Sequence, residues 1–294
     1  MNASRDAADR GYLALATLAE GPLLLDDIPS LFPFRAALVA THVGSSWQFD
    51  DPSCANCAPG RVPSDLAGGR AFIVTSDGYE ITEIPIGATE TSRTRFQFGW
   101  ALARDRLVAS VLADIEGGGA RRVAEVVEGG GSLDSINAAL FGPVASFEIV
   151  GVDDSSLASA LPYTLRLHVS TKADSTTPSL RIPVHRLAGP WVPWITPVTE
   201  PRDIVLPGPL RSEVVATLTL PRRGRLGEVT DVNVRNSIGE YALHVEQRDD
   251  TITITRRIGV FTRHVPRERF TELRELVLAA TDADAAVLEL DIDK

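Results

Sequence analysis

The sequence predicts an α+β fold, and two periodicities in its apolar residues support this prediction. Alternation of apolar and polar residues, as in 94–102 and 251–257, indicates strands with one buried face. Apolar residues that recur every three or four positions, as in 6–20 and 267–280, indicate amphipathic helices. The chain has 294 residues, a length that favours two or three compact units over a single core.

The first region, 1–90, is predicted to contain one helix followed by short strands. The helix 6–20 ends before Gly21-Pro22, and four of its residues share one face: Tyr12, Leu15, Ala16 and Ala19. Four strands are expected after it, joined in pairs by short turns: 36–43, 47–49, 71–75 and 79–84. The segment 51–69 is rich in Pro, Gly, Ser and Asp, so it is predicted to be a loop.

Three regions are predicted beyond residue 90: a mixed β and helical region 91–186, a linker 187–210 and a C-terminal β-domain 211–294. The linker is expected because this segment holds six of the 19 prolines in the chain. Helices are predicted at three places in the other two regions: 120–128, 133–141 and 267–280.

Composition and charge exclude several classes of partner. The formal charge of −10 repels a phosphate backbone, so no nucleic-acid partner is expected. No stretch approaches the roughly 20 apolar residues that cross a bilayer, so no membrane span is expected. Residues 1–10 carry no apolar export signal, and a cytoplasmic location is therefore expected. The glycine runs 117–119 and 129–131 lack the context of phosphate-binding loops, and the sequence implies no cofactor.

Two pairs of residues are weak candidates for binding. Cys54 and Cys57 have the spacing of zinc and redox motifs, but a structural zinc site needs four ligands and no second pair exists. A metal site, a disulfide and two free thiols therefore stay open for this pair. Trp191 and Trp194 lie in the proline-rich segment, where rigid aromatic side chains suit either an interface with a partner or packing onto their own domain.

Three short motifs occur in order in the first region: 6–10 (Asp-Ala-Ala-Asp-Arg), 34–36 (Phe-Arg-Ala) and 47–53 (Trp-Gln-Phe-Asp-Asp-Pro-Ser). They resemble motifs of bacterial transglutaminase-like proteins of the papain-like cysteine class. In that family a helix opens with Asp-Cys-Lys-Asp-Lys/Arg, a strand opens with Phe-Asn/Asp-His, and a third element carries Trp-x-Asp-Pro-Thr. The resemblance implies a remnant papain-type unit at the start of the chain, followed by antiparallel β-rich modules.

The resemblance also implies that the catalytic groups of the family are lost. Ala7 occupies the position of the nucleophilic cysteine and Ala36 that of the histidine base, while Asp51 keeps the orienting carboxylate. Asp50 competes for that role, because the spacing after Trp47 differs from that of the family. A methyl group neither attacks a carbonyl nor accepts a proton, so this triad is expected to be inactive.

Three features of the C-terminal stretch 239–291 follow one another: Gly239-Glu240-Tyr241, an alternating segment that ends at Arg256, and Pro266 before Phe270. This order is similar to the β-domain that accompanies the transglutaminase-like domain in multidomain bacterial proteins. Those proteins carry a further β-domain and the first part of the papain-like core before the cysteine helix. Three explanations therefore stay open: the chain is a fragment of a longer protein, a partner protein or another chain covers the truncated core, or the fold manages without the missing part.

These features together predict a non-catalytic pseudoenzyme that binds or scaffolds a partner protein. Two other functions stay open. In one, the chain is half of a composite enzyme of the transglutaminase or cysteine-peptidase type, and a partner chain supplies the nucleophile. In the other, the chain is a structural β-domain protein of a cell-envelope assembly.

Overall fold

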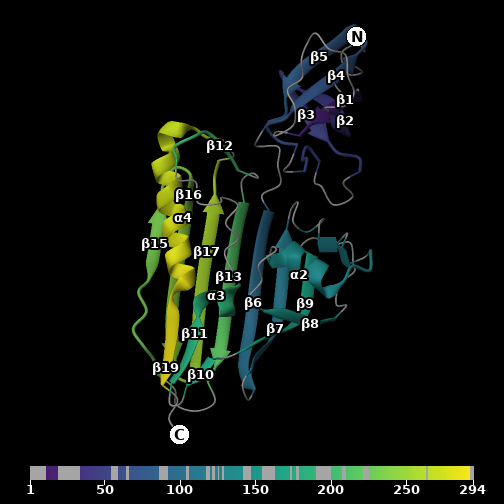
Figure 1. Ribbon diagram of the computed structural model, residues 1–294. Helices are drawn as coiled ribbons and strands as arrows, with labels where there is room; N and C mark the ends of the chain where they lie inside the picture. The colour runs from purple at the N-terminus through teal and green to yellow at the C-terminus, as the bar shows by residue number, and fades with distance from the viewer. Residues whose placement is uncertain are drawn as a thin grey trace. The chain divides into compact units, whose positions relative to one another are not determined.

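The computed structural model describes most of the chain: residues 11–18, 34–53, 59–63, 66–85, 92–103, 106–116, 120, 123–124, 126–127, 129–141, 147–153, 163–172, 174–176, 179–189, 200–206, 210–220, 225–262 and 264–291. The chain forms two compact units, Met1–Thr91 and Ser92–Lys294. In Figure 1 the first unit is purple to blue, and the second runs from blue through green to yellow.

The first unit is built on one antiparallel sheet with the strand order β3-β2-β1-β4-β5 (Figure 1). Its five strands are β1 (Gly11–Thr17), β2 (Phe34–Val43), β3 (Ser46–Asp50), β4 (Arg70–Thr75) and β5 (Gly78–Glu83). The hairpins β2–β3 and β4–β5 confirm the two strand pairs predicted from the sequence. Each hairpin has a glycine with positive φ, a conformation in which L side chains are strained: Gly44 in the β2–β3 turn and Gly78 at the start of β5.

The helix predicted over 6–20 is wrong for its described part, because residues 11–17 form strand β1. Their burial alternates from Leu13 to Ala16: Leu13 is exposed, Ala14 is buried, Leu15 is partly buried and Ala16 is buried. Strand alternation places Tyr12, Ala14 and Ala16 on one face of β1. The helical face predicted from the sequence contained two of the same residues, Tyr12 and Ala16, so this segment fits both periods. The strand prevails because β2 and β4 pair with β1 on its two sides.

The predicted α+β class with a remnant papain-type unit is therefore wrong as well. The described protein is mostly β, with several antiparallel sheets. In the described part of the first unit every regular element is a strand, so no helix there packs against the strand that carries Ala36. The unit buries its core within a curled sheet instead.

The curl of the first sheet brings its two edge strands together on the inner face. Trp47 of β3 donates a hydrogen bond from Nε1 to Oε1 of Glu80 in β5 (3.0 Å), although three strands lie between β3 and β5. Small inward side chains leave room for this curvature, and four alanines are fully buried: Ala14, Ala16, Ala40 and Ala71. Larger inward side chains fill the remaining core: Leu38, Phe49 and Ile73.

The second unit is built on an eight-stranded sheet with the order β15-β16-β17-β13-β6-β7-β9-β8. Its strands are β6 (Ser92–Ala103), β7 (Arg106–Glu116), β8 (Glu148–Asp153), β9 (Tyr163–Lys172), β13 (Leu210–Thr219), β15 (Val232–Arg235), β16 (Gly239–Arg248) and β17 (Thr251–Val260). The β6–β13 pair is parallel and the other pairs are antiparallel. Strands from the predicted regions 91–186 and 211–294 thus share one sheet, while the four-part division of the chain stays a prediction.

Smaller elements complete the second unit. A four-stranded sheet has the order β10 (Asp174–Thr176), β11 (Ser179–Pro183), β19 (Val287–Asp291) and β14 (Arg225–Leu226), and a two-stranded sheet joins β12 (Ile204–Val205) to β18 (His264–Val265). The helical elements are α2 (Leu133–Phe141), α3 (Val184–Ala188), the 3₁₀ turn η2 (Arg267–Arg269) and α4 (Phe270–Ala285). The helices predicted at 133–141 and 267–280 are confirmed by α2 and α4. No helix within the described ranges is long and apolar enough to cross a bilayer.

Helix α4 lies along the β15–β16 end of the large sheet (Figure 1). Its buried side chains follow the helical period, and the larger ones lie in its first half: Phe270, Leu273 and Leu276. Leu276 packs in the core cluster that includes Tyr241 and Leu243 of β16. Leu273 belongs to a smaller cluster with Ile238 and Val265. Helix and sheet together position the polar groups described below.

Candidate functional site

The outer face of the first sheet, opposite the core, carries apolar side chains that remain exposed. Leu13 of β1 is 54% exposed, Val74 of β4 is 44% exposed and Tyr79 of β5 is 68% exposed. Strand pairing places apolar residues next to one another on this face. Leu13 lies opposite Val39 of β2, and Val74 lies opposite Tyr79. The ring of Phe72 stacks on that of Tyr79, with centroids 4.9 Å apart. We call this surface the outer-face patch: Leu13, Leu15, Val39, Phe72, Val74 and Tyr79.

The outer-face patch departs from the usual pattern of a sheet with one solvated face. Such strands alternate apolar residues toward the core with polar residues toward water. Here Leu13 and Val39 point outward, on the side opposite the buried Ala14 and Leu38. A contiguous apolar surface of this kind typically marks an interaction site.

Two of the positions that the resemblance assigned to the triad, Ala36 and Asp51, lie within the described part of the first unit. Ala36 lies in β2, opposite Ala16 of β1. Asp51 directly follows β3 and is buried, and its Oδ1 accepts hydrogen bonds from the backbone N–H (2.8 Å) and the hydroxyl (2.6 Å) of Ser53. Asp50, the alternative carboxylate, accepts a hydrogen bond from the backbone N–H of Gly60 (2.5 Å). Each carboxylate thus has donors within the loop that follows β3.

Several predicted site residues lie outside the described residues: Ala7, Cys54, Cys57, Trp191 and Trp194. The proposed approach of Ala7 to Ala36 and Asp51 therefore stays a prediction, as do both binding pairs. Among the described residues, no three His, Cys, Asp or Glu side chains are grouped so as to hold a metal ion.

A buried polar cluster in the second unit was missed by the sequence analysis. Arg256 of β17 and Asp284 of α4 are 5% and 7% exposed, and Nη1 of Arg256 lies 3.0 Å from both carboxylate oxygens. Arg256 also donates to the carbonyl oxygens of Ala188 (3.1 Å) and Gly189 (2.7 Å). The hydroxyl of Tyr241 donates to Asp284 Oδ1 (3.0 Å). This cluster joins β16, β17, α3 and α4.

The sequence held one signal for this cluster. Arg256 continues the inward series Ile252 and Ile254 at the spacing of two, so strand alternation alone places its guanidinium in the core. A buried arginine requires an anion, but the identity of that anion depends on α4. Since each charged group has several partners, the cluster serves stability rather than reaction chemistry.

Tyr241 is expected to make this unit sensitive to high pH. Burial, and then the charge of Asp284, raise the pKa of the Tyr241 hydroxyl. The unfolded chain loses this proton above about pH 10 and the folded chain keeps it, so the free energy of unfolding falls as pH rises. In urea unfolding, the advantage of wild type over Tyr241→Phe is expected to shrink by about 1.4 kcal/mol between pH 9 and pH 11. A constant difference over this range would contradict the assignment.

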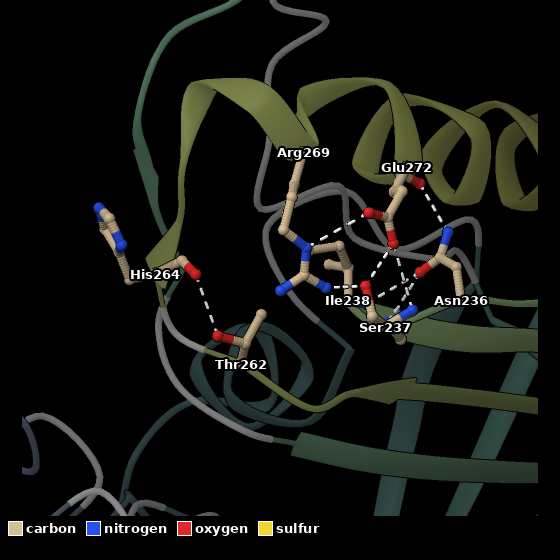
Figure 2. Close-up of polar contacts among 8 residues, drawn as sticks. Asn236, Ser237, Ile238, Thr262, His264, Arg269 and Glu272 are labelled. Carbon is tan, nitrogen blue, oxygen red and sulfur yellow. Dashed lines mark hydrogen bonds and ion pairs between the residues drawn. The ribbon is translucent and has the colours of Figure 1, made fainter.

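A second polar cluster, shown in Figure 2, ties the β15–β16 turn to the first turn of α4. Asn236 donates from Nδ2 to the backbone oxygen of Glu272 (2.8 Å), and its Oδ1 accepts from the N–H of Ile238 (3.0 Å). The carboxylate of Glu272 accepts hydrogen bonds from Ser237 and from Arg269. The pKa of Glu272 is lowered, and the hydrogen bond from the Ser237 hydroxyl makes the largest contribution.

The Ser237 hydroxyl in this cluster is held for structure rather than for attack on a substrate. It donates to Glu272 and accepts from Arg269, so both of its functions are already used. A serine nucleophile needs a general base such as an imidazole to take its proton. Figure 2 shows the ring of His264 pointing away from Ser237, while its backbone oxygen accepts from the hydroxyl of Thr262 (3.0 Å).

Comparison with known proteins relates the C-terminal part of the chain to one family. Residues 199–290 match DUF3858, described as a domain of unknown function with a solved structure. DUF3858 is a transglutaminase-like family, and the match covers 239–290 of the stretch 239–291 for which the sequence predicted such a relationship. The degenerate character of the first region stays a prediction.

Two further comparisons complete this result. No curated protein sequence matches the chain. Among solved structures, the crystal structure of a candidate protease from Parabacteroides distasonis is 13% identical, with a TM-score of 0.47. The alignment covers 96% of this chain and 40% of that protein, so this chain spans less than half of its length.

Proposed function

We propose that this chain is a non-catalytic protein-binding module, and that its first unit holds a partner protein through the outer-face patch. The exposure of Leu13, Val74 and Tyr79 on one continuous sheet face carries this proposal. Moving an apolar side chain of this size from full exposure to full burial contributes about 1.5–3 kcal/mol, and a partner would gain the share of this that belongs to the surface still exposed. Tyr79, on the edge strand β5, also supplies a rigid aromatic anchor of the kind enriched in protein interfaces.

The side chains at positions 36 and 51 support the proposal that the chain is non-catalytic. An alanine at position 36 offers no group that takes a proton from a nucleophile. Asp51, in the orienting role, receives its hydrogen bonds from Ser53 instead of an imidazole. A buried carboxylate with its own donors is stable without a catalytic histidine.

The first test compares binding by surface variants of the full chain. A triple variant, Leu13→Thr, Val74→Thr and Tyr79→Thr, keeps residues that favour strands but removes apolar surface. A control variant changes three exposed apolar residues of the second unit: Val108→Thr, Val150→Thr and Leu278→Thr. Affinity capture from a bacterial extract, followed by quantitative mass spectrometry, identifies proteins that bind wild type.

Partners retained by the control and lost by the triple variant are the expected result. The purified partner should then bind the triple variant at least about tenfold more weakly, because loss of anchor residues typically costs more than 1 kcal/mol each. Equal partner binding by the triple variant and the control variant would contradict the role of the outer-face patch.

The second test addresses catalysis directly. The chain is incubated with substrate-like esters, and separately with amine donors and glutamine-containing peptides, with and without the captured partner. We expect no acyl adduct on this chain by mass spectrometry. A covalent acyl group on any of its residues would overturn the non-catalytic assignment.

A further inference from the structure

A groove opens between the second half of α4 and the β15 edge of the large sheet, in the second unit. Its volume is about 470 Å³. Seven apolar residues line it: Val229, Val232, Leu243, Ala279, Ala283, Ala286 and Val287. Val232 and Leu243 lie opposite each other on β15 and β16, so they form neighbouring parts of its apolar surface.

The groove exists because the side chains of α4 change in size along its length. The first half of the helix presents large residues to the core, including Leu273 and Leu276. One helical turn later the residues beside the sheet edge are Ala279 and Ala283, spaced to lie on the same helix face. A methyl group fills far less space than an isobutyl group, so a hollow remains.

Two carboxylates give the groove a negative charge. Glu228 and Asp282 line it, and neither has an ion-pair or hydrogen-bond partner among the described residues. The neighbouring Asp231 differs in this respect, because His244 pairs with it (2.7 Å). The last turn of α4 holds no basic side chain, although the carbonyl end of a helix favours a cation. Apolar surface and uncompensated negative charge thus meet in one place.

We propose that this groove binds an arginine side chain presented by a segment of a partner protein. The aliphatic stem of arginine packs on apolar surface while its charged end reaches carboxylates. Its planar guanidinium donates to two carboxylate oxygens at once and is less strongly hydrated than an ammonium group. Arginine is also enriched in protein interfaces, whereas lysine is depleted. The site lies in the other unit and stands independently of the outer-face patch.

The probe for this proposal is the peptide acetyl-Leu-Arg-Leu-amide, with a twin in which citrulline replaces arginine. Citrulline keeps the size of arginine and removes its charge. Titration of the ¹⁵N-labelled full chain is followed by NMR at the backbone amides of Val232, Ala279 and Ala283. The arginine peptide is expected to bind about tenfold more tightly than its twin, because only arginine can form ion pairs with the two exposed carboxylates.

Three variants separate charge from shape. Glu228→Gln/Asp282→Asn should weaken the arginine peptide to the affinity of the citrulline peptide. The control Glu116→Gln/Glu268→Gln removes the same charge from exposed positions outside the groove, and it should bind like wild type. Ala279→Leu fills the hollow and should abolish binding of both peptides, while the remaining amide resonances show that the fold is kept.

Three results would overturn the proposal: equal affinity for the two peptides, undiminished binding by Glu228→Gln/Asp282→Asn, or shifts that map away from the groove. None of them would affect the outer-face patch, because the two surfaces are tested by different variants. Rising salt should weaken the arginine peptide selectively, since exposed ion pairs are screened.

Discussion

Replacing Asp284 by alanine is expected to lower the free energy of unfolding of the second unit by about 3–5 kcal/mol, because it leaves a buried guanidinium without its anion. Arg256 would keep its bonds to the carbonyl oxygens of Ala188 and Gly189, and these dipoles replace only part of a carboxylate. The hydroxyl of Tyr241 would lose its acceptor as well. Native-state hydrogen exchange at the amides of β16 and β17 measures the effect within this unit.

Two further variants distinguish charge burial from a general effect on α4. Asp282→Ala changes an exposed position on the same helix and should alter the free energy of unfolding by no more than about 0.5 kcal/mol. The double variant Arg256→Met/Asp284→Leu removes both charges, and it should recover most of the loss because apolar packing replaces the pair. Similar values for Asp284→Ala and Asp282→Ala would contradict the role assigned to this ion pair.

Replacing Gly239 by alanine is the second change with a large expected effect. A Cβ atom at this position would overlap the backbone oxygen of Gly259 in the neighbouring strand, and it would lie 2.9 Å from Cδ2 of Leu276. The β16–β17 ladder holds the Gly259 backbone in place, so the clash cannot be relieved by rotation of a side chain. We expect a loss of about 3 kcal/mol or more in the free energy of unfolding, at the upper end for overpacked sites.

Gly99 provides the matched control in the same sheet. A Cβ atom there would meet nothing nearer than the backbone oxygen of Ser110, at 3.9 Å. Gly99→Ala should therefore be neutral, or stabilising by up to about 1 kcal/mol through the lower entropy of the unfolded chain. Equal losses in Gly99→Ala and Gly239→Ala would show that the close approach to Gly259 is not what excludes a side chain.

Much of the second unit could be predicted from local patterns. The alternation in 251–257 and the helical period in 267–280 correspond to β17 and α4, since each pattern depends only on residues close together in the chain. The first unit was harder, because residues 11–17 fit both periods. Its short side chains, Ala14 and Ala16 among them, suit the inner face of a curled sheet, and no local signal reveals that β2 and β4 lie on either side.

The candidate sites divide in the same way. The sequence by itself determined that Arg256 points inward, because it shares the alternation of Ile252 and Ile254. Only the tertiary structure decided that its partner is Asp284, which lies 28 residues further along the chain on another element. The outer-face patch likewise depends on the curl of the sheet and on pairing among strands. Whether a side chain is buried, and which residue it contacts, depends on segments that are distant in the chain. A periodicity within one segment therefore cannot specify either property.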